Sequence, residues 1–396
     1  MFLGSFFLWF FIFAQPGDFS TIKALSSLEI SKPLKNSIPK RAISLDNEHM
    51  DKKIHLDILS HADMAEAQGV LSVYREQTRI LEKYGKDDFD LSYNKLFGKY
   101  DLYHIHSVNP SFYFFTLKKR KPTIVFVHFL PDTLDGSVKL PKFAFKAFKW
   151  YVTSFYKKAK EIVVVNPSFK KELARFGIDE KKITYIPNFV SHNSFFEKSL
   201  EEKNALKKEY GLPLDKKTVI AVGQVQTRKG VLDFIRTAEK CPNLNFVWAG
   251  GFSFKGITDG YKELKAEMEK ERPNLKFLGI QPREKMNDLY NASDIFFLPS
   301  FNELFPMALL EACNSGLPYL VRDLDLYKDI LLGDYLRASD VEGFASLLNK
   351  LGTDEAFYQN AKTYSKEIAD TYTEEKNYLL WKDFYTKVYQ KYRKKK

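Results

Sequence analysis

One stretch of this chain reads Ile295-Phe-Phe-Leu-Pro-Ser-Phe-Asn-Glu303-Leu-Phe-Pro306-Met-Ala-Leu-Leu-Glu311. Its first four residues are apolar and predict a buried strand, and Pro306 suits the first turn of a helix, where its missing N–H costs nothing. Glu303 is therefore expected at a strand-to-helix turn, and Glu311, eight positions later, on the helix. A helix start offers free N–H groups and a positive dipole end, which suit a phosphate-bearing ligand. The alternative is that both glutamates are solvated surface groups.

The chain is long enough for two domains, and its positive charge is local. Its 396 residues, 44% hydrophobic and 28% charged, describe a folded protein rather than a disordered one. Residues 118–160 contain eleven Lys or Arg against two Asp, so most of the net charge of +11 lies in this window. A local basic patch therefore has to be explained. Cys241 and Cys313 form no disulfide or metal pattern, which fits a reducing compartment, and no structural metal is expected.

The amino terminus is apolar but matches no complete targeting signal. Residues 1–14 are few for a membrane span, which needs about 20. A signal peptide would begin with a basic residue, whereas the first one here is Lys23. An apolar, strand-like run follows Met50 closely. We therefore interpret residues 1–49 as a dispensable extension, with Met50 as an alternative start.

Strand-like apolar runs recur between helix-like segments in the rest of the chain, a pattern typical of parallel-sheet α/β domains. The expected strands are 54–59, 102–106, 123–128, 162–165 and 183–186 in the first half, and 218–222, 245–249, 275–278, 295–298 and 319–321 in the second. Segment 195–215 is predicted to be a linker and helix between two doubly wound domains. We expect the extension 1–49, an amino-terminal Rossmann-like domain at 50–192, a carboxy-terminal Rossmann-like domain at 193–373, and a helix with a basic tail at 374–396.

Three segments in the second half follow strands and carry glycine or basic residues. The segment Gly223-Gln-Val-Gln-Thr-Arg-Lys-Gly230 lies between a strand and a helix, where open α/β sheets bind ligands. Its glycine permits a tight turn, and Arg228 with Lys229 can hold a diphosphate. Gly250-Gly251 lets a ligand approach the backbone, and Gly279-Ile280 offers backbone groups to a base edge. Taken singly, an Arg-Lys pair is often solvated surface and a glycine pair a plain turn.

Together these segments resemble the retaining family-four glycosyltransferases, in which two Rossmann-like domains face each other across a cleft, the architecture called GT-B. The ordered set is Gly223…Arg228-Lys229-Gly230, Gly250-Gly251, Phe277-Leu-Gly279 and Glu303-x7-Glu311, and the resemblance spans roughly residues 50–390. It implies that Glu311 binds the ribose hydroxyls of a nucleotide sugar and that Glu303 lies near the donor sugar. It also implies that Arg228 and Lys229 neutralise the leaving diphosphate.

The resemblance implies further roles. Ile280 would contact the base through its backbone, and His128, after the strand at 123–128, matches the family's histidine facing the sugar. A histidine at a strand end is otherwise more often structural. Gly69 matches a glycine-bearing loop that approaches the donor. We therefore take as catalytic Arg228, Lys229, Glu303 and His128, and as donor-binding Gly69, Gly223, Gly250, Ile280, Leu304, Phe305 and Glu311.

Two positions depart from the family pattern. Many relatives carry a second glycine soon after the first in the amino-terminal loop, where this chain has Leu71 and Ser72. Many also have glycine directly after the first glutamate, where this chain has Leu304. Neither change removes a charged group. No base is paired with a nucleophile, which fits retention at the anomeric carbon if the leaving diphosphate takes the acceptor's proton. The motif set requires no metal or cofactor, since the UDP-sugar is a substrate.

The basic window has the composition of a membrane-surface helix. Residues 139–160 hold seven Lys, seven aromatics and no acid. At helical spacing Phe145, Phe148, Val152 and Phe155 share one face, with lysines beside it. Such a helix lies at a membrane surface with its apolar side among acyl chains, and each Lys contributes about 1 kcal/mol near an anionic leaflet. The expected membrane-binding residues are Lys142, Lys146, Lys149, Phe145, Phe148 and Trp150. The alternatives are a core-facing helix with a solvated Lys face and a nucleic-acid surface, although no nucleic-acid module accompanies it.

A membrane-binding first domain implies a lipid acceptor, because that domain usually binds the acceptor in this family. Segments 127–131, 224–229 and 248–254 look like those of the bacterial enzymes that glycosylate diacylglycerol or glucosyl-diacylglycerol. This resemblance implies UDP-glucose or UDP-galactose as donor, an α-linked glycolipid that can anchor lipoteichoic acid as product, and a peripheral position at the cytoplasmic face of the membrane. The alternatives are a soluble GT-B enzyme acting on a polysaccharide, a nucleotide-sugar epimerase, and a non-catalytic membrane-binding scaffold.

Overall fold

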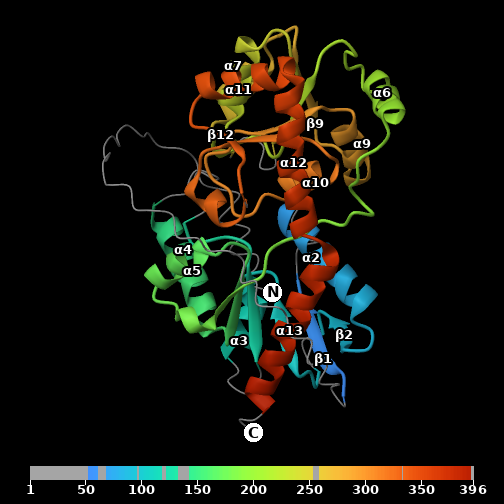
Figure 1. Cartoon of the computed structure of the whole chain (residues 1–396). Helices are drawn as coiled ribbons and strands as arrows, with labels where there is room; N and C mark the ends of the chain where they lie inside the picture. Colours follow the sequence, from blue (N-terminus) through green and yellow to red (C-terminus); the bar gives the residue numbers. More distant parts are fainter. Residues whose placement is uncertain are drawn as a thin grey trace.

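The chain folds around two parallel sheets, each with helices on its faces (Figure 1). The computed structural model describes residues 52–60, 68–95, 98–117, 122–132, 142–252, 258–331 and 333–393. The extension 1–49 and Met50 lie outside these residues, as do basic residues 118–121 and Lys139.

The first sheet has the strand order β2-β1-β3-β4-β5-β6. Its strands are β1 Ile54–Leu59, β2 Phe89–Tyr93, β3 Leu102–Ile105, β4 Thr123–Val127, β5 Glu161–Val164 and β6 Ile183–Tyr185. The accompanying helices are α2 Gln68–Tyr84, α3 Pro110–Leu117, α4 Lys142–Lys158, α5 Ser168–Arg175 and the 3-10 turn η2 Glu180–Lys182. Strand β4 is buried along its whole length, which explains its continuous apolar sequence, because helices cover both faces of a parallel sheet.

The second sheet has the order β12-β11-β10-β7-β8-β9. Its strands are β7 Thr218–Val222, β8 Asn245–Ala249, β9 Leu275–Gly279, β10 Ile295–Leu298, β11 Tyr319–Arg322 and β12 Leu336–Ala338. Its helices are α6 Leu200–Glu209, α7 Val231–Lys240, α8 Tyr261–Met268, α9 Met286–Asn291, α10 Met307–Asn314, α11 Val341–Thr353 and α12 Glu355–Thr371, with 3-10 turns η3 Thr227–Lys229, η5 Arg283–Lys285 and η6 Asp325–Asp329. Every described strand pairing in both sheets is parallel.

The predicted fold class of two doubly wound α/β domains is confirmed, and all ten predicted strands are present. Two further strands, β2 and β12, were not predicted, and both are edge strands. Only the first residue of β2 is buried, and β12 has three residues, so neither carries a strong apolar pattern. Pro306 lies just before α10 in an extended conformation rather than in its first turn.

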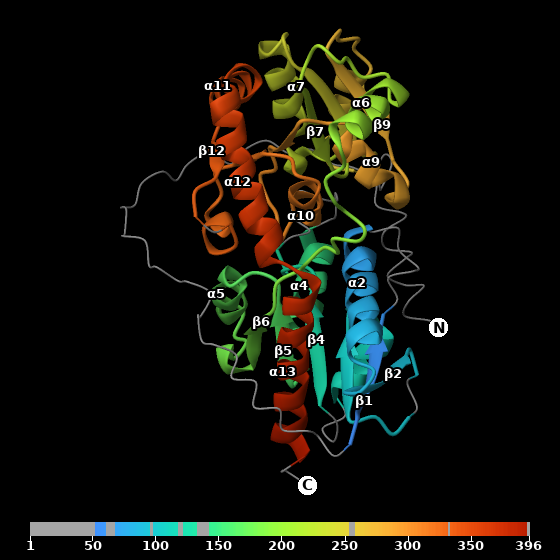
Figure 2. The ribbon, with the colours of Figure 1, turned by 45° about the vertical axis from the view of Figure 1, so that its right-hand side comes forward.

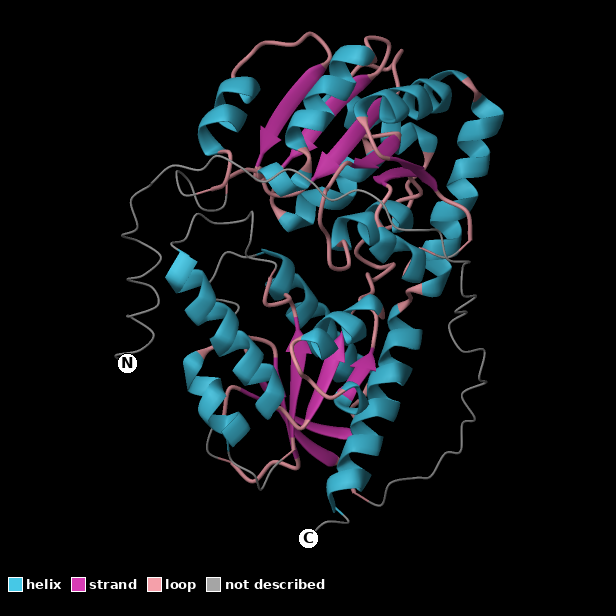
Figure 3. Cartoon of the chain, turned by 90° about the vertical axis from the view of Figure 1, so that its left-hand side faces the viewer, coloured by secondary structure: helices cyan, strands magenta, loops and turns pink. Residues whose placement is uncertain are grey.

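The carboxyl ends of the strands in both sheets point toward the boundary between the domains (Figure 3). A small pocket lies at this boundary, lined by Val73, Gln77 and Phe126 from the first domain and Met307 from the second. The boundary therefore joins the strand ends at which parallel α/β sheets bind ligands.

The last helix, α13 Glu374–Arg393, returns from the second domain and lies along the first (Figure 2). The Trp381 ring lies 5.0 Å from that of His104 on β3, and the Tyr385 hydroxyl is 2.7 Å from His104 Nδ1. The sequence predicted this helix but not its position along the first domain. Because α13 returns to that domain, the chain crosses the boundary twice, once between β6 and α6 and once between α12 and α13.

Candidate active site

A buried ion pair joins the loops that follow β7 and β10. Lys229 Nζ lies 2.5 Å from Glu303 Oε1, and the two side chains are only 15% and 7% exposed. Burial works to raise the pKa of Glu303, but Lys229 and Arg228 outweigh it and hold that pKa below its usual range. Burial lowers the pKa of Lys229, and Glu303 opposes this change. Neither residue is the solvated surface group that the alternative interpretation required.

Close backbone packing holds this pair in place. Gly230 ends η3 with φ 71°, and a Cβ there would lie 2.3 Å from the carbonyl oxygen of Pro299 after β10. The Phe301 N–H donates to the Arg228 carbonyl at 2.8 Å, so the two loops are joined directly. Arg228 is half-exposed, and its Nε donates to Gln226 Oε1 at 2.9 Å. The sequence thus brings three of its four expected catalytic residues, Arg228, Lys229 and Glu303, to one sheet edge.

Three glycines line the neighbouring part of this edge: Gly223 after β7, Gly250 after β8 and Gly279 at the end of β9. The Gly223 N–H donates to Ala249 O at 3.0 Å, and the Gly250 N–H donates to Gly279 O at 2.8 Å. A Cβ on Gly250 would lie 1.8 Å from Gly223 O, so this close approach requires glycine. Ile280, the residue after Gly279, is 61% exposed. Two of the three predicted donor-binding glycines, Gly223 and Gly250, therefore lie together with Gly279 on backbone that carries no side chains.

Glu311 is buried on α10, 5% exposed, and each of its carboxylate oxygens accepts one hydrogen bond from the protein. Arg283 Nη1 donates to Oε1 at 2.7 Å, and the Tyr290 hydroxyl donates to Oε2 at 3.0 Å. Burial, with Glu311 adding to its effect, raises the pKa of Tyr290 well above its ordinary value, which keeps this hydroxyl a donor. The solvated interpretation is wrong for Glu311 as well. The sequence did not single out Arg283 or Tyr290.

Two expected donor-site residues contact other parts of the protein. The Phe305 ring is buried against Tyr372, with centroids 5.1 Å apart, so it packs in the core rather than facing a ligand. The Leu304 carbonyl accepts from Asn166 Nδ2 at 3.3 Å. Asn166 follows β5 of the first domain, so Leu304 contributes to the contact between the domains.

His128 belongs to a cluster of three histidines. Its Nε2 lies 3.1 Å from His106 Nδ1, and the two rings are stacked with centroids 5.2 Å apart. The ring of His104 lies 4.5 Å from that of His106. Burial lowers the pKa of His104 and of His128 to about 3, and that of His106 well below its ordinary value. All three rings are therefore neutral near pH 7. The sequence analysis did not single out His104 or His106, although two histidines two positions apart at the end of β3 place their side chains on the same face of the sheet.

Gly69 lies in the first turn of α2, which begins at Gln68. The expectation that it sits in a loop is therefore wrong, because the helix starts one residue earlier. Residues 61–67, which precede it, lie outside the described ranges.

Helix α4 turns its predicted apolar face inward. Val152 and Phe155 are fully buried, and Phe148 stacks on Phe129 with ring centroids 6.1 Å apart. The expectation that this face meets acyl chains is wrong, and the alternative of a core-facing helix holds for it.

The outer edge of α4 is made of other residues. Phe143 and Trp150 are 67% and 70% exposed, and Lys146 is exposed between them. Phe145 is half-buried, and the side chain of Lys142 lies outside the described part. The exposed surface of this helix is therefore aromatic and basic, but it contains fewer of the expected membrane-binding residues than the sequence predicted.

Lys149 is turned toward the protein. Its Nζ lies 2.5 Å from Asp132 Oδ1 and 5.0 Å from the centroid of the Phe176 ring. Within the described ranges, no helix combines the length and apolarity needed to cross a membrane.

Comparison with known proteins matches both halves of the chain to family models. Residues 54–194 match the model described as "Glycosyltransferase Family 4", and residues 202–368 match "Glycosyl transferases group 1". The chain is 42% identical over 338 residues to the alpha-galactosylglucosyldiacylglycerol synthase of Streptococcus pneumoniae (strain ATCC BAA-255 / R6), covering 85% of this chain and 90% of that relative. It is 26% identical over 283 residues to the processive diacylglycerol alpha-glucosyltransferase of Acholeplasma laidlawii, covering 68% and 78%.

Solved structures share the fold at low identity. The Anabaena protein HepE, in complex with UDP and glucose, superposes with a TM-score of 0.67 at 14% identity, covering 84% of this chain and all of that one. A glycosyltransferase of Rickettsia africae superposes with a TM-score of 0.60 at 17% identity, covering 86% and 99%. The arrangement of the two domains is therefore shared across widely divergent sequences.

Proposed function

The chain belongs to the glycosyltransferases of group 1 and family 4, and from this membership we propose that it transfers a hexose from a UDP-sugar to a membrane lipid. The proposed acceptor is diacylglycerol or a glycosyl-diacylglycerol, as the names of the two relatives suggest. The proposed donor is UDP-glucose or UDP-galactose, and HepE, which binds UDP and glucose within the same fold, supports this choice. The reaction retains the configuration at the anomeric carbon.

The observation that carries this proposal is the buried Lys229–Glu303 pair with Arg228 beside it. In the transfer, the bond between the anomeric carbon and the diphosphate oxygen breaks, and a bond to the acceptor oxygen forms on the same face. The acceptor's proton passes to the leaving diphosphate. Arg228 and Lys229 stabilise the negative charge that develops there, an effect typically of about 3–4 kcal/mol for a well-placed donor. Glu303 holds the lysine ammonium in position.

The rest of the site binds the donor in this proposal. The base lies along the bare backbone at Gly250 and Ile280, and Glu311 accepts hydrogen bonds from the ribose hydroxyls. His128 faces the sugar as a neutral ring. No nucleophile and no metal or other cofactor is assigned a role.

The acceptor reaches the site from a membrane surface that the first domain contacts. The exposed edge of α4, with Phe143, Lys146 and Trp150, supports this part of the proposal. Exposed aromatic rings insert at the lipid interface, while lysine is attracted to anionic headgroups. The proposed location is peripheral, at the cytoplasmic face.

Product analysis tests the function. The full chain is incubated with UDP-glucose or UDP-galactose and with liposomes of anionic lipid that contain diacylglycerol or glucosyl-diacylglycerol. Mass spectrometry is expected to show one hexose added to the lipid, and NMR to show an α-linkage. Transfer to a soluble polysaccharide but not to lipid would overturn the acceptor, a β-linked product would overturn retention, and an epimerised UDP-sugar without transfer would overturn the activity.

A further inference from the structure

The carboxylate of Glu311 is oriented before any donor arrives. Arg283 from η5 and Tyr290 from α9 each donate to one of its oxygens, at 2.7 and 3.0 Å. A carboxylate oxygen has two lone pairs, so one on each oxygen remains for a ligand. Two vicinal hydroxyls of a ribose are the donors that would use both. Arg283 and Tyr290 therefore fix the carboxylate without filling its acceptor capacity.

Arg283 also reaches the other domain. Its Nη2 lies 3.4 Å from Glu76 Oε1 on α2, and its guanidinium carbon lies 5.2 Å from the centroid of the Phe195 ring. Phe195 belongs to the segment that joins the domains. The arginine thus lies between two carboxylates, one from each domain, and over a ring of the connecting segment. Burial acts to lower the pKa of Arg283, but Glu311 and Glu76 reverse this and raise it, so the arginine stays charged.

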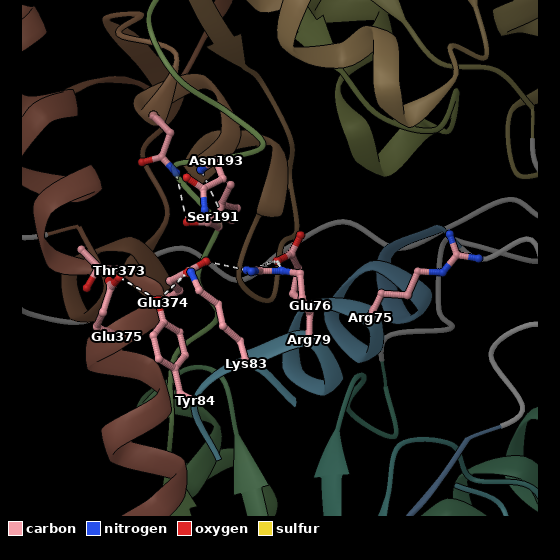
Figure 4. Close-up of polar contacts among 12 residues, drawn as sticks. Arg75, Glu76, Arg79, Lys83, Tyr84, Ser191, Asn193, Thr373, Glu374 and Glu375 are labelled. Atoms are coloured by element: carbon pink, nitrogen blue, oxygen red, sulfur yellow. Dashed lines mark hydrogen bonds and ion pairs between the residues drawn. The ribbon is translucent and has the colours of Figure 1, made fainter. Parts of the chain in front are cut away.

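Glu76 is itself held in place. Arg79 Nη2 donates to Glu76 Oε2 at 3.0 Å and to Glu374 Oε2 at 2.6 Å, and Figure 4 shows Arg79 lying between these two carboxylates. Glu374, at the start of α13, is 3% exposed and also accepts from Lys83 and from the Tyr84 hydroxyl. Burial acts to raise the pKa of Glu374, but these donors hold it well below its ordinary value. Carboxylates and arginines therefore alternate from the second crossing between the domains to Glu311, in the order Glu374, Arg79, Glu76, Arg283 and Glu311.

We propose that Arg283 is a positioning residue for the donor, which orients Glu311 toward the ribose and is itself anchored by Glu76 of the opposite domain. This inference rests on the proposed function, because it takes the ribose to bind at Glu311. Its consequence is that donor affinity depends on Glu76, a residue that does not touch the donor. Glu76 attracts one end of the Arg283 guanidinium. The arginine therefore does not turn both of its terminal nitrogens toward Glu311, and the lone pairs that remain on Glu311 stay free for the ribose.

Substitutions at the two anchoring residues test the proposal, with the Kd for UDP measured by calorimetry and steady-state kinetics measured on liposomes. Arg283→Met keeps an unbranched apolar stem without the guanidinium and its charge, and it is expected to raise the KM for the UDP-sugar and the Kd for UDP about tenfold, with kcat within about threefold. Arg283→Lys is expected to recover part of this loss. Glu76→Gln is expected to raise the same constants about threefold to fivefold.

The double variant Glu76→Gln, Arg283→Met gives the sharper result. If Glu76 acts through Arg283, it binds UDP no more weakly than Arg283→Met alone, because Glu76 has nothing left to anchor. Glu82→Gln is the matched control, since Glu82 lies on the same helix and accepts from Tyr93 instead, and it should leave UDP binding unchanged.

The outcomes separate this inference from the proposed function. If the wild-type protein binds UDP and transfers sugar, but Arg283→Met changes neither the Kd nor the KM, Arg283 has no positioning role and the inference fails alone. Independent, additive effects of Glu76→Gln and Arg283→Met would also overturn it. A lower melting temperature with unchanged UDP affinity would assign Arg283 a structural role only. If the wild-type protein neither binds UDP nor transfers sugar, the proposed function fails first, and this inference fails with it.

Discussion

The two domains build their sides of the boundary in different ways. The carboxy-terminal domain takes its charged groups from short loops after strands, so that Lys229 and Glu303 meet through local strand-to-helix turns. The amino-terminal domain assembles its polar groups from segments far apart in sequence. His104 contacts Tyr385, and Lys83 contacts Glu374, each pair separated by more than 280 positions. On the donor side each charged group is thus placed by its own strand-to-helix turn, whereas the opposite side is built from contacts between segments that lie much further apart in the sequence.

Two lysine–carboxylate pairs, one in each domain, give the largest contrast. Lys229–Glu303 and Lys149–Asp132 have the same separation of 2.5 Å, but the first is buried, whereas the side chains of the second are 38% and 58% exposed. Lys229→Met is expected to lower kcat by about a hundredfold to a thousandfold, because it removes charge stabilisation at the leaving diphosphate. Lys149→Met should change kcat less than twofold, since an exposed pair contributes about 0–1 kcal/mol. Transfer rates at saturating donor and lipid provide the measurement.

Stability has to be separated from catalysis here, because Lys229→Met leaves a buried carboxylate without its partner. The double variant Lys229→Met, Glu303→Gln removes both charges and is expected to regain melting temperature but not activity. Near-normal turnover in either variant would show that this pair is not part of the reaction.

Acidification is expected to weaken the amino-terminal domain before the donor site. His104 and His106 are buried to 0% and 1% exposure, and they face each other, His128, Tyr74 on α2 and Tyr385 on α13. Their pKa values are lower in the folded than in the unfolded chain, so the unfolded chain binds more protons below the ordinary value of 6.5. Stability is therefore fully present above pH 6.5 and falls as the pH drops below it. Glu303 and Glu374, whose pKa values are depressed, lose their contribution only below about pH 4.5.

Between pH 7.5 and pH 5.5 the lowered pKa values of the three clustered histidines should together reduce the free energy of unfolding by about 4 kcal/mol. The measurement is the urea midpoint of unfolding at each pH, followed by tryptophan fluorescence. His104→Asn should reduce this pH dependence by about a third, because one of the three histidines is replaced by an amide, which does not titrate in this range. A midpoint that does not change between these pH values would contradict the neutral, buried cluster.

The same division explains what the sequence predicted. Continuous apolar runs predicted the central strands, and the apolar run before Glu303 with Pro306 after it predicted a strand-to-helix turn. Each of these signals lies within a few consecutive residues. Edge strands such as β12 carry little apolar pattern. The partners of Glu311 were not predictable, because Arg283 reads as a surface residue until α9 and α10 pack together. The position of α13 depends on a tertiary contact with His104 that no local pattern encodes.

Helix α4 gives the smallest expected effect and the most direct test of what covers the amino-terminal domain. Its exposed and its packed aromatic residues are expected to respond differently to substitution, since Trp150 is 70% exposed and Phe148 packs against Phe129. Trp150→Ser should weaken binding to anionic liposomes about fivefold, the equivalent of about 1 kcal/mol for one interfacial ring, and raise the KM for lipid acceptor without changing the melting temperature. Phe148→Ser should instead lower the melting temperature, because it opens a gap beneath the helix.

Lys146→Ala, beside Trp150, is expected to weaken liposome binding by a similar factor at low salt and by less at high salt, since the attraction of lysine to an anionic surface is screened. In all three variants the affinity for UDP should match that of the wild type, because the donor loops lie in the other domain. If Trp150→Ser and Lys146→Ala bind liposomes as the wild type does, the outer edge of α4 is not the membrane contact. In that case the basic charge of the amino-terminal domain does not act through this helix.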